Sequence, residues 1–372
     1  MERWKMDFYR FSVSWTRVLP AGDVTVINKA GIEYYKNLIK ELLENGIEPV
    51  VKWWITFNEP VHICQGYADG NLFAPGFSFS GVGDYLVGHT VLKAHAKVYH
   101  LYDKEFRSLY KGKVGICLES KWFEPKSDIS ADLEASNVAL QFLLGWFAHP
   151  IFSEKGDYPE VMKRKIAQNS QAEGRLRSRL PEFSAEWIQK IKGSADFFGL
   201  NHYSTLMVTM GRIGDQISRE DDAGVLKSAN PEWPCGKPKW LKVVPWGLRK
   251  LLNWIKTEYN NPPVFIAENG YGDSGEIQDT GRIHYYVNYI AEMLKAVNIG
   301  GCNVFAYTAW SLTDNYEWIT GYTEKFGLYH INFNHPARPR IPKDSSSIIA
   351  DIIRSKKLPI QYFDKEVLSY DN

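Results

Sequence analysis

Short runs of apolar residues alternate along the chain with longer segments in which apolar residues recur every three or four positions. The runs predict strands buried on both faces, as in a parallel sheet, at 113–118, 197–203, 264–267 and 304–312. The longer segments predict helices at 28–45, 84–106, 132–147, 185–192, 246–259, 282–297 and 348–354. This alternation predicts an α/β fold with a parallel sheet. At 372 residues, a (β/α) barrel explains the length best, and a doubly wound sheet is the alternative.

The first part of the chain departs from this regular order. Residues 6–15 alternate apolar and polar side chains and predict a strand leading into a loop, with Arg10 facing inward. Two apolar runs, 47–51 and 53–57, then follow with only Lys52 between them. Parallel neighbours need a crossover of about a dozen residues, and one unbroken strand here would be about twice the usual length. We therefore expect that a crossover is missing between the two runs.

Composition gives no sign of a second domain and argues against charged partners. Residues 211–239 hold glycine, proline and charges without periodicity and predict a surface excursion. No shift in composition marks a boundary, so we expect residues 1–372 to form a single domain. The chain has 44 basic and 43 acidic residues and no long basic block, which argues against nucleic-acid and membrane partners. A neutral small molecule or polymer is the expected substrate.

The sequence predicts neither a metal nor another cofactor. No G-x-G-x-x-G is present, and the four cysteines lie far apart without a C-x-x-C. The histidines that we interpret as structural, because they lack metal-ligand spacing, are His62, His89, His95 and His149. There is no N-x-[ST] sequon, no apolar run of membrane-spanning length and no signal-like apolar segment near residue 1, so no compartment is assigned.

Candidate chemistry gathers where the predicted strands end. The run at 264–267 stops abruptly at Glu268 and Asn269, and the C-terminal ends of parallel strands form the ligand-facing rim of an α/β fold. Polar and aromatic residues follow the other predicted strands in the same way. The candidate site residues are Arg10, Asn58, Glu59, Asn201, Tyr203, Glu268, Trp310, Glu317 and Trp318.

Two carboxylates from different strands suit the hydrolysis of a glycosidic bond, in which one acid protonates the leaving oxygen and the other attacks or activates water. A cation and a hydroxyl group would keep Glu268 ionised, whereas an aromatic surrounding would raise the pKa of Glu59. Taken singly, each residue is more often structural. A glutamate at a strand end is commonly a solvated cap or an ion-pair partner, and Arg10 alone suits a structural ion pair. Taken singly, Trp310 and Trp318 are each more often aromatic residues of the core than platforms for a sugar.

Several longer motifs together resemble glycoside hydrolase family 1, the β-glucosidases and their relatives. They are Trp-Ile-Thr-Phe-Asn-Glu-Pro at 54–60, Phe-Ile-Ala-Glu-Asn-Gly at 265–270, and the segments at 9–15, 310–318 and 326–330. The similarity runs along essentially the whole chain and is closest to the animal, insect branch. It implies a TIM barrel and a retaining double displacement without a cofactor, acting on a small-molecule glycoside. A homodimer is left open, and relatives are often secreted or lysosomal.

The resemblance also implies individual roles. Glu59 would be the acid/base and Glu268 the nucleophile, Asn58 would bind the sugar 2-hydroxyl, and Arg10 and Tyr203 would tune Glu268. The remaining residues that it implies for substrate binding are Asn201, Trp310, Glu317, Trp318 and Phe326. The pair Glu317-Trp318 argues for an unphosphorylated glycone, and Glu59, where plant thioglucosidases have glutamine, argues for O-glycosides.

Two departures from the family pattern affect the expected activity. The chain begins at what resembles the second strand, without the first strand and its glycone-binding glutamine, and a His-Trp pair and helix are missing before Lys52. We therefore expect an incomplete barrel with severely reduced or absent turnover, since each lost hydrogen bond could cost about 1 to 3 kcal/mol. The alternatives are an inactive remnant that binds a sugar or a partner, and an animal thioglucosidase.

Overall fold

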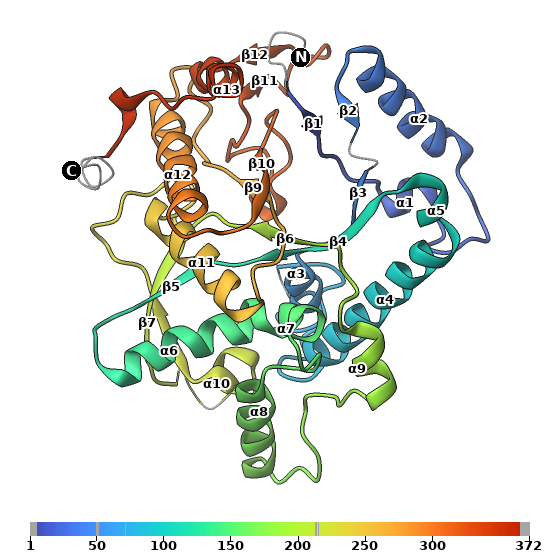
Figure 1. Cartoon of the computed structure of the whole chain (residues 1–372), viewed down its shortest axis with the longest axis vertical. Coiled ribbons are helices and arrows are strands. Elements are labelled where there is room, and N and C mark those ends of the chain that lie inside the picture. Colours follow the sequence, from blue (N-terminus) through green and yellow to red (C-terminus); the bar gives the residue numbers. More distant parts are fainter. Residues whose placement is uncertain (1–5, 50–51, 71, 213, 215, 365–372) are drawn as a thin grey trace.

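The computed structural model describes residues 6–49, 52–70, 72–212, 214 and 216–364. Five parallel strands form its central sheet in the order β10-β9-β6-β4-β3. In Figure 1 the strands run through the middle of the molecule, with α11 and α12 on one side and α2 and α4 on the other. The fold is thus α/β with a parallel central sheet, as the alternation of apolar runs and helices predicted.

The strands are β1 (Phe8–Tyr9), β2 (Glu48–Pro49), β3 (Trp53–Asn58), β4 (Lys113–Glu119), β5 (Trp122–Pro125), β6 (Phe197–Asn201), β7 (Thr205–Met210), β8 (Val225–Ser228), β9 (Val264–Asn269), β10 (Val304–Ala309), β11 (Tyr329–Ile331) and β12 (Arg340–Pro342). The helices are α1 (Trp15–Val18), α2 (Lys29–Glu44), α3 (Pro60–Gln65), α4 (Gly83–Glu105), α5 (Arg107–Tyr110), α6 (Ser130–Leu140), α7 (Trp146–Phe152), α8 (Glu160–Ala172), α9 (Ala185–Ile191), α10 (Arg219–Ala223), α11 (Pro245–Glu258), α12 (Thr280–Asn298) and α13 (Asp344–Ser355). Shorter helical turns are η2 (Gln141–Gly145), η3 (Trp318–Thr320) and η4 (Ile360–Tyr362).

The central strands are buried because their residues are apolar on both faces. Every residue of β6 and β9 is buried, including the polar residues at their C-terminal ends. Close backbone approach requires glycine in two places: a Cβ on Gly199 would lie 2.7 Å from the Ile116 carbonyl oxygen, and a Cβ on Gly115 would lie 2.7 Å from that of Phe197. The sheet is therefore tightly packed where it carries the site.

Strand register sets which polar residues become neighbours. Along the rim, Asn58 is paired with Cys117, Glu119 with Asn201, and Asn201 with Glu268. Because all five strands are parallel, these C-terminal residues meet at the same edge.

Two short strands lie beside the central sheet without completing it. β1 and β2 pair in parallel with each other, and among the described residues neither pairs with β10 or β3. A groove of about 680 Å³ separates β1 from β10, and we call it the β1–β10 groove. It is lined by residues of 6–12 and 305–315 and by apolar side chains of α12 and α13. The parallel sheet is thus open in the described part of the chain, in line with the expectation of an incomplete barrel.

Most predicted elements are present with shifted ends. The predicted helix 132–147 is instead α6, a π-helical turn at 141–145, and α7, which extends to Phe152. Of the strand leading into a loop predicted over 6–15, only Phe8–Tyr9 is a strand, and α1 begins at Trp15. Residues 50–51 of the predicted strand 47–51 lie outside the described residues.

The prediction of an irregular excursion over 211–239 was wrong in part. The segment contains α10 and β8, and β8 pairs antiparallel with β7. Pattern alone missed these elements because both are short, and α10 (Arg-Glu-Asp-Asp-Ala) carries almost no apolar residue. The strands β5 and β7 and the helix α8 were likewise missed.

Candidate active site

Glu59 and Glu268 stand at the ends of two strands of the central sheet. Glu59 follows β3 and caps α3 with a left-handed backbone, φ 50°, and its N–H donates to the Cys117 carbonyl at 2.9 Å. Pro60 then starts α3, where its missing N–H costs nothing. Glu268 is the penultimate residue of β9 and is buried.

A chain of side-chain hydrogen bonds joins the two carboxyl groups. Arg10 donates through Nη1 to Glu268 Oε1 at 2.7 Å and through Nη2 to Asn58 Oδ1 at 2.6 Å. Asn201 Nδ2 donates to the same Asn58 oxygen at 3.2 Å and to Glu59 Oε1 at 2.7 Å. The structure therefore brings together five of the residues singled out in the sequence.

Glu268 has the surroundings of an ionised carboxylate. Arg10 binds one of its oxygens, and the Tyr203 hydroxyl donates to the other at 2.6 Å. Burial, and after it the Glu268 charge, raises the pKa of Tyr203 well above its ordinary value, so the hydroxyl keeps its proton and acts as a donor. The predicted cation and hydroxyl group are both in place.

Glu59 has the opposite character. Burial raises its pKa to about 8, with further increases from the carboxylates of Glu268 and Glu119, against smaller lowering by Asn201 and Lys121. The carboxyl therefore holds its proton at neutral pH. Loss of water and neighbouring negative charge account for this pKa, whereas the sequence interpretation assigned it to an aromatic surrounding.

His62 belongs to this site although the sequence interpretation treated it as structural. Its Nε2 lies 3.3 Å from Glu59 Oε2, and its Nδ1 lies 2.7 Å from Gln65 Oε1. The signal that could have found it is its position three residues after Glu59 on α3, since residues at that spacing share a helix face.

Three further candidate residues, Glu317, Trp318 and Phe326, differ in burial and in their contacts. Burial raises the pKa of Glu317 to about 7, and its Oε1 has no hydrogen-bond partner among the described residues. Trp318 is 65% exposed and contacts Phe73, whose ring stacks on His62 at 4.9 Å, so Trp318 lies at the mouth. Phe326 is buried with its ring against Tyr203, 6.1 Å between centroids.

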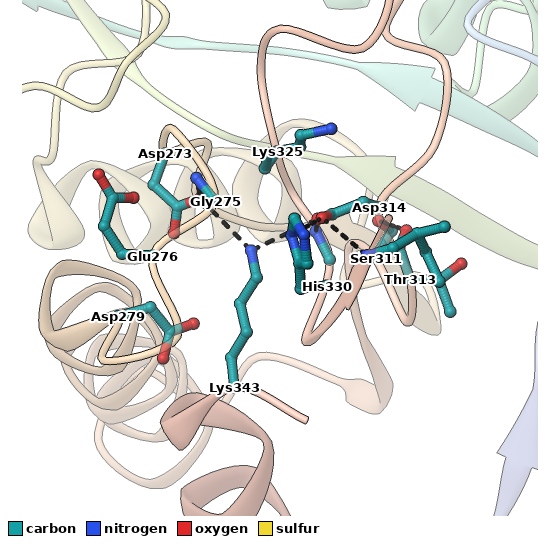
Figure 2. A network of polar contacts seen from close by, with 12 residues as sticks. Asp273, Gly275, Glu276, Asp279, Ser311, Thr313, Asp314, Lys325, His330 and Lys343 are labelled. Atoms are coloured by element: carbon teal, nitrogen blue, oxygen red, sulfur yellow. Dashed lines mark hydrogen bonds and ion pairs between the residues drawn. The ribbon is translucent and has the colours of Figure 1, made fainter. Parts of the chain in front are cut away.

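The loops after β9 and β10 are tied together behind the site by buried ion pairs. Figure 2 shows Lys343, just before α13, reaching between Asp273 and Asp314. Its Nζ lies 3.4 Å from an oxygen of each. Asp314 also contacts His330 Nδ1 at 3.0 Å and accepts from the backbone of Gly327. This network fixes the loop that leads from Trp310 to Glu317.

Close packing sets the position of the same loop against β9. A Cβ on Gly270 would lie 1.9 Å from the Trp310 carbonyl oxygen, which accepts from the Tyr286 hydroxyl at 2.9 Å.

Within the described ranges, no group of three or more His, Cys, Asp or Glu side chains could hold a metal ion. No helix of the same residues is long and apolar enough to cross a bilayer.

Comparison with known proteins identifies the family. Residues 1–52 and, as a separate segment, 50–358 match the family model of glycosyl hydrolase family 1. The chain belongs to glycosyl hydrolase family 1. The two segments of this family 1 chain meet at residues 50–52, where the sequence predicts the missing crossover. The family assignment, and with it the glycoside hydrolase class, is confirmed.

Relatives of this family 1 chain carry different names. It is 39% identical to human cytosolic beta-glucosidase, over 95% of this chain and 84% of that protein. It is 41% identical to rat lactase/phlorizin hydrolase over 95% of this chain, but it spans only 21% of that longer protein.

Two solved structures show the TIM-barrel β-glucosidase fold. Aphid myrosinase has a TM-score of 0.89 and 39% identity, covering 95% of this chain and 85% of its own. A variant of the rice beta-glucosidase Os3BGlu6, in a covalent complex with Glc, has a TM-score of 0.87 and 33% identity, covering 94% and 85%. Both neighbours therefore contain residues with no counterpart here.

Proposed function

We propose that the chain carries the residue set of a retaining β-glycosidase acting on unphosphorylated β-glucosides or related O-glycosides. The observation that carries this proposal is the pair of unlike carboxyl groups at one rim. Glu268 is bound by a cation and a hydroxyl group, whereas Glu59 keeps a proton at neutral pH. This is the division of roles that a double displacement needs.

In the first step, Glu268 attacks the anomeric carbon while Glu59 gives its proton to the glycosidic oxygen. The bond from the anomeric carbon to that oxygen breaks, the leaving group departs as an alcohol, and a glycosyl ester forms on Glu268. Arg10 and Tyr203 hold the Glu268 oxygens in place for the attack.

In the second step, Glu59 is a carboxylate and accepts a proton from water. The water oxygen bonds to the anomeric carbon, the ester bond breaks, and Glu268 leaves as a carboxylate. Glu59 is protonated again, which closes the cycle. Two inversions at one carbon retain the β configuration.

Glycone binding is assigned to the residues around this pair. Asn58 Oδ1 already accepts from Arg10 and Asn201, so its Nδ2 would face the sugar 2-hydroxyl. Trp310 would provide the apolar platform, and the unpartnered Oε1 of Glu317 an acceptor for a hydroxyl. Trp318 at the mouth would close over the sugar.

The relatives support an O-glycoside substrate only in part, because a β-glucosidase and a myrosinase are both 39% identical to this chain. The protonated Glu59 carboxyl favours an oxygen leaving group, which needs a proton to depart. We also infer that turnover is low, because among the described residues the sheet is open on both sides of β1 and β2, and a transition state needs a rigid site.

Labelling with a mechanism-based 2-fluoro β-glucoside tests the chemistry separately from the rate. We expect mass spectrometry to locate a covalent sugar on Glu268 within residues 264–269, and Glu268→Gln to remain unlabelled. A folded chain that stays unlabelled after prolonged incubation would favour a non-catalytic binding protein instead.

The leaving group gives a second test. Glu59→Gln should slow labelling strongly when the leaving group is a poor one, such as an alkyl alcohol, and much less for 2,4-dinitrophenol, which departs without a proton. Equal losses for both leaving groups would contradict the role of Glu59 as acid.

A further inference from the structure

A third carboxyl group lies at the same rim as the two glutamates. Glu119 ends β4 two residues after Cys117, so both side chains point to the same face of the sheet. Cys117 lies in the interior cluster of the sheet, and its carbonyl accepts from the Glu59 N–H. Glu119 is paired in register with Asn201, the donor to Glu59. Its carboxylate is one of the charges that act on Glu59.

Lys121 keeps this third carboxyl group ionised. Its Nζ lies 2.6 Å from Glu119 Oε1, and the two side chains are 26% and 10% exposed. Burial works to raise the pKa of Glu119, but Lys121, with His62 and Arg219, lowers it below the ordinary value. A negative charge therefore persists beside Glu59 where burial alone would have removed it.

The pair stands outside the chemistry described above. Glu119 and Lys121 form no hydrogen bond to Glu268, Arg10 or Tyr203 in the described structure. The titratable and charged groups that face Glu59, or act on it through a neighbour, are Glu268, Arg10, Tyr203, Cys117, His62, Glu119, Lys121, Arg219 and Glu220.

We infer that Glu119, held by Lys121, is a positioning residue that keeps the proton on Glu59 when the leaving group must be protonated and keeps Glu59 basic when water must be activated. The inference rests on the proposed function of Glu59 as acid/base. No contact of Glu119 with substrate is invoked.

The reaction cycle explains why a second anion is useful. In the first step both Glu268 and Glu119 are negative, and both favour the protonated form of Glu59. In the glycosyl-enzyme intermediate, Glu268 is a neutral ester, so its charge no longer acts on Glu59. Glu119 stays ionised in both states and is then the remaining carboxylate that makes Glu59 a better base for water.

Carbon-13 NMR of the glutamate carboxyl groups measures the effect without any need for turnover. The Glu59 signal is assigned by its loss in Glu59→Gln, and its titration midpoint is compared between the wild type and variants. We expect Glu119→Gln to lower the midpoint by on the order of one pH unit, because a like charge is removed. Glu119→Asp, which keeps the charge, should stay near the wild type.

A double variant guards against misfolding of Glu119→Gln, in which Lys121 loses its partner. In Glu119→Gln with Lys121→Met, no charge is left unpaired, and Glu119 acts on Glu59 more strongly than Lys121 does. The midpoint should therefore fall between that of Glu119→Gln and that of the wild type. Glu292→Gln is the matched control, because Glu292 is a buried glutamate that pairs with Arg249 and Lys295 and should leave the Glu59 midpoint unchanged.

An unchanged midpoint in folded Glu119→Gln, or in the folded double variant, would overturn the inference. A shifted midpoint in a chain that the 2-fluoro glycoside does not label would support the Glu119 effect and contradict the proposed function instead. The two failures are thus distinguishable.

Discussion

At the scale of single residues, one chemical group is given two behaviours by its neighbours. Glu59 and Glu268 are both glutamates at strand ends. Glu268 meets a guanidinium and a hydroxyl group, and Glu59 meets an amide and other carboxylates. Burial first, and then the neighbouring carboxylates, raise the pKa of Glu59, because loss of water and a nearby anion both favour the neutral form.

Tyr203→Phe should slow the labelling of Glu268 roughly 10- to 100-fold, since a hydrogen bond to a charged group contributes about 1.5–3 kcal/mol. The measurement is the rate of adduct formation with the 2-fluoro glycoside. Tyr99→Phe is the matched control, because its hydroxyl donates to Asp196 at 3.1 Å outside the described site. Equal rates for Tyr203→Phe and the wild type would show that this hydroxyl does not act on Glu268.

Asn201→Ala should move the alkaline limb of the pH–rate profile upward. The hydrogen bond from Asn201 lowers the pKa of Glu59, so its removal raises the pKa further above about 8. The acid form would then persist to higher pH, so with a leaving group that needs the proton the rate of glycosidic cleavage should fall at a more alkaline pH than in the wild type. A downward shift would contradict this sign.

At the scale of elements, strand ends and loops place these residues. The register of β3, β4, β6 and β9 aligns the rim. The loop from Trp310 to Glu317 is then fixed from behind by the Lys343 network (Figure 2). Lys343 is 1% exposed, so its ammonium group depends on Asp273 and Asp314 for compensation. The loop conformation thus depends on a side chain far along the sequence.

Lys343→Met should lower the free energy of unfolding by about 3 kcal/mol, because it removes a buried cation from between two carboxylates and leaves Asp273 with Arg282 and Asp314 with His330 as their remaining partners. Urea denaturation measures the loss. Lys40→Met is the control, since Lys40 pairs with Glu44 at 3.6 Å on the exposed face of α2, and its change should stay within about 0.5 kcal/mol. Similar losses for both variants would contradict a structural role of the network.

At the scale of the whole molecule, the sheet carries a site but is not closed in the described residues. The β1–β10 groove separates β1 from β10, and in the ranges that the structure describes β2 does not pair with β3. One large apolar cluster nevertheless extends from Val61 to Ala350. Most site residues therefore lie in the well-packed part of the chain. Arg10 lies in the first part, residues 6–49, whose strands do not pair with the central sheet among the described residues.

We infer that the chain unfolds as a single domain, because this one cluster links helices from α3 to α13, and Met6 and Phe8 of the first part pack against the apolar clusters. Differential scanning calorimetry should show one transition whose calorimetric and van't Hoff enthalpies agree. Two resolved transitions would indicate that the first part, residues 6–49, folds separately.

Supplying the expected crossover before β3 should increase the rate. Insertion between residues 51 and 52 of the aphid myrosinase segment that lacks a counterpart here should raise the rate of labelling at least 10-fold and raise the melting temperature, because Arg10 would be held more rigidly. As a control, the same segment in reversed order should bring no gain. Unchanged rates with the native segment would show that the open sheet does not limit the chemistry.

The sequence by itself determined the class of fold, most of the helices and the identity of the candidate residues. Buried parallel strands are apolar throughout, and amphipathic helices show a 3.6-residue period, so α2, α4 and α12 could be read from local pattern. The two glutamates could also be identified from the sequence, because a motif consists of a residue and its neighbours along the chain.

Only the tertiary structure decided how those residues act. The proton on Glu59 depends first on burial and then on Glu268 and Glu119, which lie 209 and 60 positions away in the chain and become neighbours only through strand register. Lys343 carried no sequence signal for its contacts, and β8 within 211–239 is ordered by pairing with β7. Electrostatic and pairing energies depend on distances in space, and a linear pattern does not contain those distances.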